Sequence, residues 1–144
     1  MKSTIALRIA AVLTLIHAVL HTVGGLFSAP EHGPDEINVL NTMKAFQFDF
    51  MGSMRSYWDF YFGFGLIVTL FLLFEAVLLW QLASLAKSDA GRARPFMLTL
   101  LGAFLAMMVF SWLYFFNAPL VVEALIAILI GLAYLFSRQK PSIK

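Results

Sequence analysis

The stretch of sequence that decides the fold is residues 57–83, which read YWDFYFGFGLIVTLFLLFEAVLLWQLA. A helix crosses the hydrocarbon core of a bilayer with about 20 apolar residues, and this stretch contains only two acidic residues, Asp59 and Glu75. Three other stretches have a similar apolar character: 5–27, 96–116 and 119–136. We therefore predict an all-α polytopic membrane protein, in which one domain, residues 1–144, forms an antiparallel bundle of four transmembrane helices.

The composition of the whole chain also indicates a lipid environment. Of the 144 residues, 61% are hydrophobic and 12% are charged, a balance far from that of soluble globular proteins. The net charge is only +2, and the cations lie at the edges of the apolar runs, which argues against a nucleic-acid partner. The chain has no cysteine, so disulfides, thiolate metal sites and a cysteine nucleophile are excluded.

The Lys and Arg residues predict the direction of each span, because connections rich in these residues stay on the cytoplasmic side. Connection 28–56 has only Lys44 and Arg55 against four acidic residues, so it belongs on the outer side. We therefore expect both termini in the cytoplasm and the spans in a bacterial inner membrane. The cations expected on the cytoplasmic side are Lys2, Arg8, Lys87, Arg92, Arg94, Arg138, Lys140 and Lys144.

The first apolar run has an alternative interpretation as a signal peptide. Lys2 and Arg8 precede the run, and Ser28 and Ala29 supply small residues at its end. Two histidines interrupt the run, however, so we favour a permanent transmembrane helix.

The connections contain further signals. In 28–56, apolar residues recur at three- and four-residue spacing, which predicts an amphipathic helix with Asp35 as its cap, lying on the outer membrane face or over the bundle. The alternation in Ala45–Phe50 leaves a short strand as the alternative. The apolar positions of the helix predicted in 28–56 are Ile37, Leu40, Met43, Phe46 and Phe50.

The sequence Asn117-Ala118-Pro119 predicts a tight turn between the last two spans.

Small and polar residues mark the faces where membrane helices pack together. Each span has such residues at helical spacing, so these faces are expected to point toward the other helices. The residues are Ala10, Thr14, His17, His21, Gly24 and Ser28 in the first span, Gly65, Thr69, Ala76 and Ala83 in the second, Thr99, Gly102 and Ala106 in the third, and Glu123, Ala127, Gly131 and Tyr134 in the fourth.

Ionisable side chains inside a bilayer are candidate functional residues, because each costs several kcal/mol unless it is paired, neutralised or hydrated. His17 lies near the middle of the first span, and His21 lies one turn closer to the outer face. Glu123 lies in the outer half of the fourth span, which neighbours the first in an up-and-down bundle. We expect an outward-opening ligand-binding pocket lined by His17, His21 and Glu123, with Asp59, Trp112 and Asn117 at its mouth.

Glu75 is expected to lie apart from this pocket. It follows Asp59 by sixteen residues, which is about 24 Å along a helix. Arg8 and Thr99 lie at a similar depth in the inner half, so we expect Glu75 to form a structural pair with one of them.

Two other interpretations of the buried residues stay open. His17, His21 and Glu123 would also serve as a hydrogen-bonded network that only fixes the register of the helices. They would alternatively form a zinc or iron site, since histidines at positions i and i+4 project on one face and the carboxylate adds a third ligand. The chain lacks the Glu-x-x-His and His-Glu-x-x-His motifs of established metal sites, so we predict no metal site and identify no cofactor.

The run Met51–Gly65, which reads MGSMRSYWDFYFGFG, follows the histidine-containing first span. In this run and in its layout, the chain resembles a family of small bacterial four-helix integral membrane proteins, a family without an established activity. The resemblance implies the same fold over nearly the whole chain. In size and intramembrane acids the chain is also similar, at the level of architecture, to the sterol-isomerase and sigma-2-receptor bundles, which bind sterol-like ligands between four core helices.

Two classes of function fit these observations. In the first, a small integral membrane protein binds a hydrophobic or lipid-like molecule and, in the enzymatic form of the hypothesis, also transforms it. In the second, the chain is a non-catalytic accessory subunit or scaffold of a membrane complex. The expected partners are the lipid bilayer, a hydrophobic small molecule, and either a second copy of the chain or another protein of a membrane complex.

Overall fold

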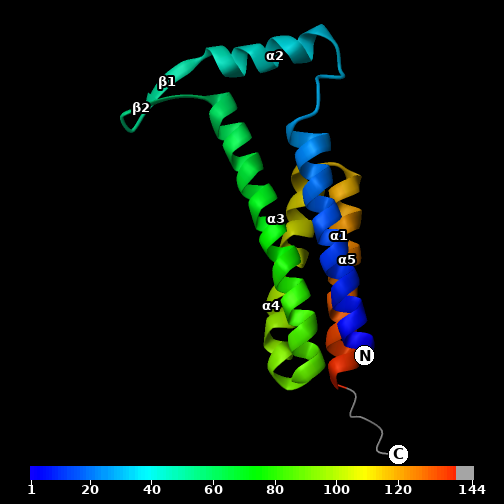
Figure 1. Ribbon diagram of the computed structural model, residues 1–144. Coiled ribbons are helices and arrows are strands. Elements are labelled where there is room, and N and C mark those ends of the chain that lie inside the picture. The colour runs from blue at the N-terminus through cyan, green and yellow to red at the C-terminus, as the bar shows by residue number, and fades with distance from the viewer. Residues whose placement is uncertain (139–144) are drawn as a thin grey trace, which may run out of the picture. The chain divides into compact units, whose positions relative to one another are not determined.

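The structure is a computed structural model that describes residues 1–138, so Lys140 and Lys144 lie outside the described residues. Within this range the chain forms five α-helices, one π-helical segment and one two-stranded hairpin (Figure 1). The elements are α1 (Lys2–Leu20), η1 (His21–Leu26), α2 (Pro34–Ala45), β1 (Gln47–Phe50), β2 (Ser53–Ser56), α3 (Tyr57–Ser88), α4 (Ala90–Tyr114) and α5 (Asn117–Arg138).

Four helical stretches are long and apolar enough to cross a membrane. They are Lys2–Leu26, Tyr57–Ser88, Ala90–Tyr114 and Asn117–Arg138. The prediction of four such stretches is therefore confirmed, although the helices extend beyond the predicted apolar runs. The longest difference lies between the second and third stretches, where α3 continues to Ser88 and α4 begins at Ala90.

The described chain divides into two compact units. The helical unit comprises residues 1–17 and 72–138, and the hairpin unit comprises residues 18–71. Helices α1 and α3 are each divided between the two units, with one part in the helical unit and the other part in the hairpin unit.

The helical unit has one hydrophobic core, to which α1, α3, α4 and α5 all contribute. Eight of its fifteen buried members are alanines, and small side chains let helix backbones approach closely. Phe104, at 0% exposed, is the largest fully buried side chain. The core members are Ala6, Leu7, Ala10, Ala11, Leu79, Leu82, Ala83, Ala86, Ala93, Met97, Phe104, Ile126, Ala127, Ile130 and Ala133.

The predicted inward face of α4 is wrong. Thr99, Gly102 and Ala106 are exposed. The buried positions lie on the opposite face instead, where the large side chains of Met97 and Phe104 fill more of the core than small side chains can. The buried residues of α4 are Ala93, Met97, Phe104 and Ser111.

The predicted turn between the last two spans is displaced by two residues. Asn117, Ala118 and Pro119 form the first turn of α5, where a proline near the helix start loses no intrahelical hydrogen bond. The chain reverses at Phe115 and Phe116.

A side-chain clamp joins the beginning of α4 to the end of α5. Arg94 donates from Nη2 to the Ser137 carbonyl and from Nε to the Ser137 hydroxyl, the latter at 3.3 Å. The last carbonyls of a helix have no partner within the helix. Arg94 therefore satisfies an unpaired group of α5 and places a positive charge at its carboxyl end, where the helix dipole favours one.

The hairpin unit carries the long connection. Its helix α2 confirms the predicted helix, but α2 ends at Ala45, and Phe46 and Phe50 lie outside it. The alternative of a strand is correct for Gln47–Phe50, which pairs antiparallel with β2. The prediction that Asp35 caps α2 is wrong, because Gly33 occupies the cap position, where no side chain caps the helix.

Two polar contacts join η1 to α3 within the hairpin unit. His21 Nε2 donates to the Gly65 carbonyl at 3.1 Å, and the hydroxyls of Thr22 and Thr69 lie 2.9 Å apart. Leu26 also packs on α3 at Gly65, where a Cβ would overlap the Leu26 side chain.

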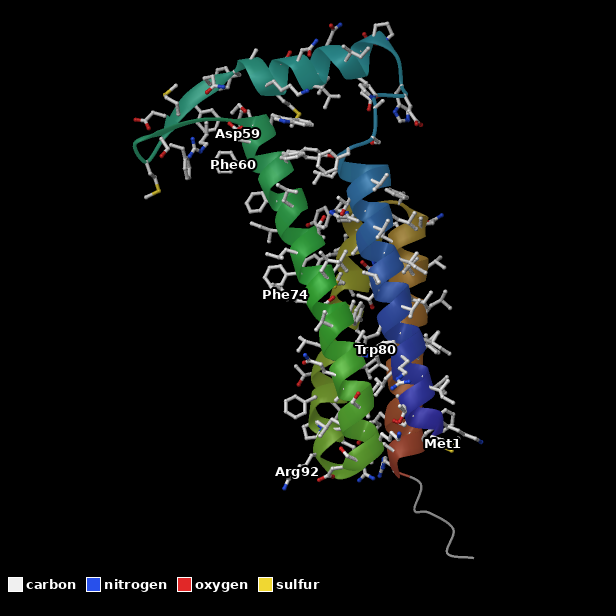
Figure 2. The ribbon with its side chains drawn as sticks, viewed as in Figure 1. Met1, Asp59, Phe60, Phe74, Trp80 and Arg92 are labelled. Carbon is white, nitrogen blue, oxygen red and sulfur yellow. The ribbon has the colours of Figure 1, made fainter. Side chains whose placement is uncertain are left out.

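We expect the clamp to stabilise the protein measurably. Arg94→Gln removes hydrogen bonds from a charged donor and should lower the free energy of unfolding by about 1.5 kcal/mol, read from thermal unfolding in a mild detergent. Arg92→Gln is the matched control, because Arg92, labelled in Figure 2, is exposed and its ion pair among the described residues is with nearby Asp89, an interaction worth about 0.5 kcal/mol or less. Equal losses in both variants would contradict the role of the clamp.

The packing of Leu26 on Gly65 gives a second prediction. Gly65→Val should destabilise the protein by about 1 kcal/mol, at the low end for overpacking, because only the flexible end of the Leu26 side chain has to move. Gly63→Val is the matched control on the same helix, since a Cβ there meets no atom within 4 Å. Unfolding midpoints of the two variants in the same detergent test the prediction, and a Gly65→Val midpoint at or above that of Gly63→Val would refute it.

The turn before α2 gives a third prediction. The Glu36 carboxylate accepts the N–H groups of His32 and Glu31 at 2.7 and 2.8 Å, and the bond from His32 contributes most to holding the pKa of Glu36 below 4.5. A lowered pKa in the folded state means that these bonds stabilise the turn above pH 4.5 and are lost as the pH falls through that lower pKa. Hydrogen-exchange protection of both amides should therefore fall at acidic pH. Glu36→Gln cannot titrate, and the same acid-induced loss in that variant would contradict the explanation.

Candidate functional site

Glu123 is the centre of the candidate site. It lies on the buried face of α5 and is only 3% exposed. The hydroxyl of Ser111, a buried residue of α4, hydrogen-bonds to its carboxyl group. Its Oε2 atom is buried and has no hydrogen-bond partner among the described residues. A buried acceptor without a donor costs about 1–3 kcal/mol, so this oxygen is available to a ligand that carries a donor.

Glu75 belongs to the same environment. It is half-buried on α3, and its carboxyl group interacts electrostatically with that of Glu123. Its Oε2 atom, like that of Glu123, is buried without a hydrogen-bond partner in the described part of the chain. The helical unit therefore brings together two carboxyl groups, from α3 and α5, that the sequence interpretation had kept apart.

Neither predicted partner of Glu75 pairs with it. The Arg8 guanidinium lies over the Trp80 ring, 5.0 Å from its centroid, and the Thr99 hydroxyl donates to the Pro95 carbonyl at 3.2 Å. Figure 2 shows Trp80 on the side of α3 that faces α1, with Phe74 on the opposite side. A cation above an aromatic face is attracted by the ring, which gives Arg8 an alternative to a carboxylate.

His17 is the second buried residue that the sequence had predicted for the site. It is 8% exposed and lies one helical turn after Thr14, which is fully buried. The Thr14 hydroxyl donates to the Ala10 carbonyl of its own helix at 2.9 Å. The predicted inward face of α1 is therefore confirmed at Ala10, Thr14 and His17.

The other four predicted residues have different surroundings. In the hairpin unit, His21 donates to the Gly65 carbonyl, and Asp59 Oδ2 accepts the N–H and hydroxyl of Ser56 at 2.7 and 2.9 Å. In the helical unit, Trp112 is 72% exposed and Asn117 is also exposed. Each of these two lies near the α4–α5 connection, and an exposed tryptophan at a helix end is typical of the membrane interface.

The described residues contain no group of three or more His, Asp or Glu side chains that could hold a metal ion. The metal alternative built on His17, His21 and Glu123 therefore receives no support from the arrangement of residues 1–138.

An open cavity of about 370 Å³ lies between α3 and α4 in the helical unit. Its walls are leucine and phenylalanine side chains with two polar residues, Gln81 and Thr99. None of the six predicted site residues lines it. Its apolar walls suit a hydrocarbon chain, which would bind there by van der Waals contact. The lining residues are Leu78, Gln81, Leu82, Leu85, Phe96, Thr99 and Leu100.

Sequence reasoning missed Ser111 and misplaced Glu75. Ser111 follows Phe104 by seven residues on the same helix face, so large apolar residues at heptad spacing would have pointed to it. The proximity of Glu75 and Glu123 depends on the relative positions of α3 and α5, which residue spacing within one helix does not reveal.

Comparisons with known proteins give no match: no family model matches the chain, and neither does any curated protein or solved structure. The resemblances noted from the sequence stay predictions.

Proposed function

We propose that the chain is an integral membrane protein, an antiparallel four-helix bundle, that binds a hydrophobic or lipid-like molecule among its helices. Four stretches long and apolar enough to span a bilayer support the bundle. Two short connections, at Asp89 and at Phe115–Phe116, support antiparallel neighbours. The distribution of Lys and Arg supports a bacterial inner membrane with both termini in the cytoplasm.

The observation that carries the proposal is the buried carboxyl group of Glu123. Replacing a buried polar group by an apolar one is often neutral or stabilising, so a fold that needed only packing would not require a carboxylate here. Ser111 satisfies part of this group, and Oε2 stays without a donor in the described residues. A ligand with an apolar body and a hydroxyl or amine group would supply that donor.

Glu75 extends the same argument to a second acceptor. Its buried Oε2 and that of Glu123 belong to interacting carboxyl groups, so one polar head with two donor hydrogens would serve both. His17, also buried in this unit, adds an imidazole, a side chain that both donates and accepts hydrogen bonds. Such a set would support proton transfer to a bound molecule, which is the enzymatic form of the proposal.

One observation favours the alternative of an accessory subunit or scaffold. Helix α2 contains no buried residue. Two of its apolar side chains, Ile37 and Val39, are 47% and 59% exposed. A protein that covers α2 would remove this surface from water. Native mass spectrometry after extraction in a mild detergent separates the two proposals, since a retained small molecule supports the first and a stoichiometric protein supports the second.

A matched pair of ligands tests the role of the carboxyl group. Oleyl alcohol has a hydroxyl donor, whereas methyl oleate has the same chain and none. We expect oleyl alcohol alone to raise the unfolding midpoint of the wild type, because a ligand present at about ten times its Kd stabilises a protein by about 1.4 kcal/mol. Glu123→Gln should lose most of this effect.

Glu31→Gln is the control, because it makes the same chemical change in an exposed loop. It should keep the wild-type response to oleyl alcohol. Equal stabilisation by both ligands, or an undiminished response of folded Glu123→Gln, would refute a donor-dependent site at Glu123.

A further inference from the structure

The turn between β1 and β2 places an apolar side chain where hairpin chemistry favours a polar one. Met51 and Gly52 both have positive φ, at 53° and 82°, as in the two-residue turns that favour Asn, Asp or Gly. The Gly52 N–H donates to Asp49 Oδ1 at 2.8 Å, which fixes the turn. Methionine gains nothing from this backbone conformation, so its presence calls for another explanation.

Met51 does not act alone. Phe50, Met51 and Met54 are 50%, 92% and 58% exposed, and we name these three residues the hairpin apex. They lie at or beside the turn, on both strands. Because Phe50 pairs with Ser53 and Met54 pairs with Asp49, Phe50 and Met54 lie on opposite faces of the hairpin. In water, the apex would therefore expose large apolar side chains on both faces and at the turn, which is unfavourable.

The hairpin is fixed to the first turn of α3. Ser56 ends β2, and its N–H and hydroxyl both donate to Asp59. The ring of Phe60 packs on Phe48 and Phe50, with centroids 6.1 and 5.3 Å apart. Figure 2 shows Asp59 and Phe60 at the end of α3, next to the strands. The apex is thus held at a defined level relative to this end of α3.

This end of α3 has the character of a bilayer interface. Tyr57, Trp58 and Tyr61 lie in its first turns, and such aromatic residues collect at the level of lipid headgroups. Two cations lie nearby and suit the phosphates of lipid headgroups: Lys44, whose Nζ is 4.4 Å from the centroid of the Trp58 ring, and Arg55 on β2.

We propose that the hairpin apex inserts into the outer leaflet, at the boundary between lipid headgroups and acyl chains. The apolar apex suits the acyl side of this boundary, and Lys44 and Arg55 suit its phosphate side. Apolar groups of interfacial segments lie about 5–10 Å into this boundary. The proposal rests on the proposed placement of α3 across a membrane, and it assigns the connection between the first two spans a role in anchoring.

Site-directed fluorescence tests the proposal, because the chain has no cysteine of its own. Met51→Cys is labelled with an environment-sensitive fluorophore and reconstituted into phosphatidylcholine vesicles, with or without nitroxide-labelled phosphatidylcholine. We expect blue-shifted emission, strong quenching by a nitroxide near the headgroups, and several-fold weaker quenching by aqueous iodide than for a label at His32. The His32 side chain is 86% exposed in a polar loop of the same unit.

Leu70→Cys separates the failure of this proposal from failure of the membrane placement. Leu70 is 52% exposed on α3, about 20 Å along the helix from Tyr57, and its label should be quenched by a nitroxide deep in the acyl chains. If Leu70 is quenched but the Met51 label behaves like the His32 label, the insertion of the apex is overturned. It is also overturned if the Met51 label is shielded from iodide but not quenched by lipid, since a protein would then cover it. Absence of quenching at Leu70 would overturn the membrane placement itself.

Discussion

Backbone hydrogen bonding in lipid is the constraint from which the rest of the structure follows. In the hydrocarbon core each N–H and C=O group must find a partner within the protein, so an isolated segment crosses only as a helix. Helix α3 meets this condition over 32 residues without interruption. Among residues 1–138, the strands and the positive φ angles occur only in the connection between the first two apolar stretches. Within residues 1–138, non-helical backbone is therefore confined to the connections, whereas the π-helical segment η1 lies within the first apolar stretch and stays helical.

The same constraint explains why ionic side chains gather at helix ends, where four N–H or four C=O groups lack partners within the helix. Asp89 caps α4 by accepting the N–H of Arg92 at 3.0 Å, and Arg94 donates to the last turn of α5. Asp59 ties the start of α3 to β2. From the sequence, Arg94 was predicted as a charge that sets the direction of the spans, and Asp59 as a residue at the mouth of the pocket. Both also form hydrogen bonds at helix ends, and this structural role requires no ligand.

The fold was predictable where hydropathy alone decides it, and less so where packing decides it. Four apolar runs identified four long helices, and Ala10, Thr14 and His17 at helical spacing identified the buried face of α1. The predicted continuation of this face is wrong at Gly24 and Ser28, which are exposed. The face of α4 was mispredicted because small residues were taken as contacts, whereas Phe104 and Met97 fill the core. The association of Glu75 with Glu123 was missed because it depends on the relative positions of two helices. Within 45–50, helical and alternating periodicity coexist, and pairing with β2 favours the strand.

The buried carboxyl groups and the exposed hairpin apex each lie in surroundings that do not match their polarity. Within residues 1–138, Glu123 has an acceptor oxygen buried without a donor, and Met51 has an apolar side chain exposed on a backbone that favours polar residues. Stability alone would select against both, because an apolar residue at 123 and an asparagine at 51 fit their local environments better. Local conflicts of this kind concentrate at functional positions, where the rest of the fold offsets their cost. The proposed polar ligand at Glu123 and the proposed lipid contact at Met51 would each remove the conflict, so the two proposals address the two positions where the fold suits its surroundings least.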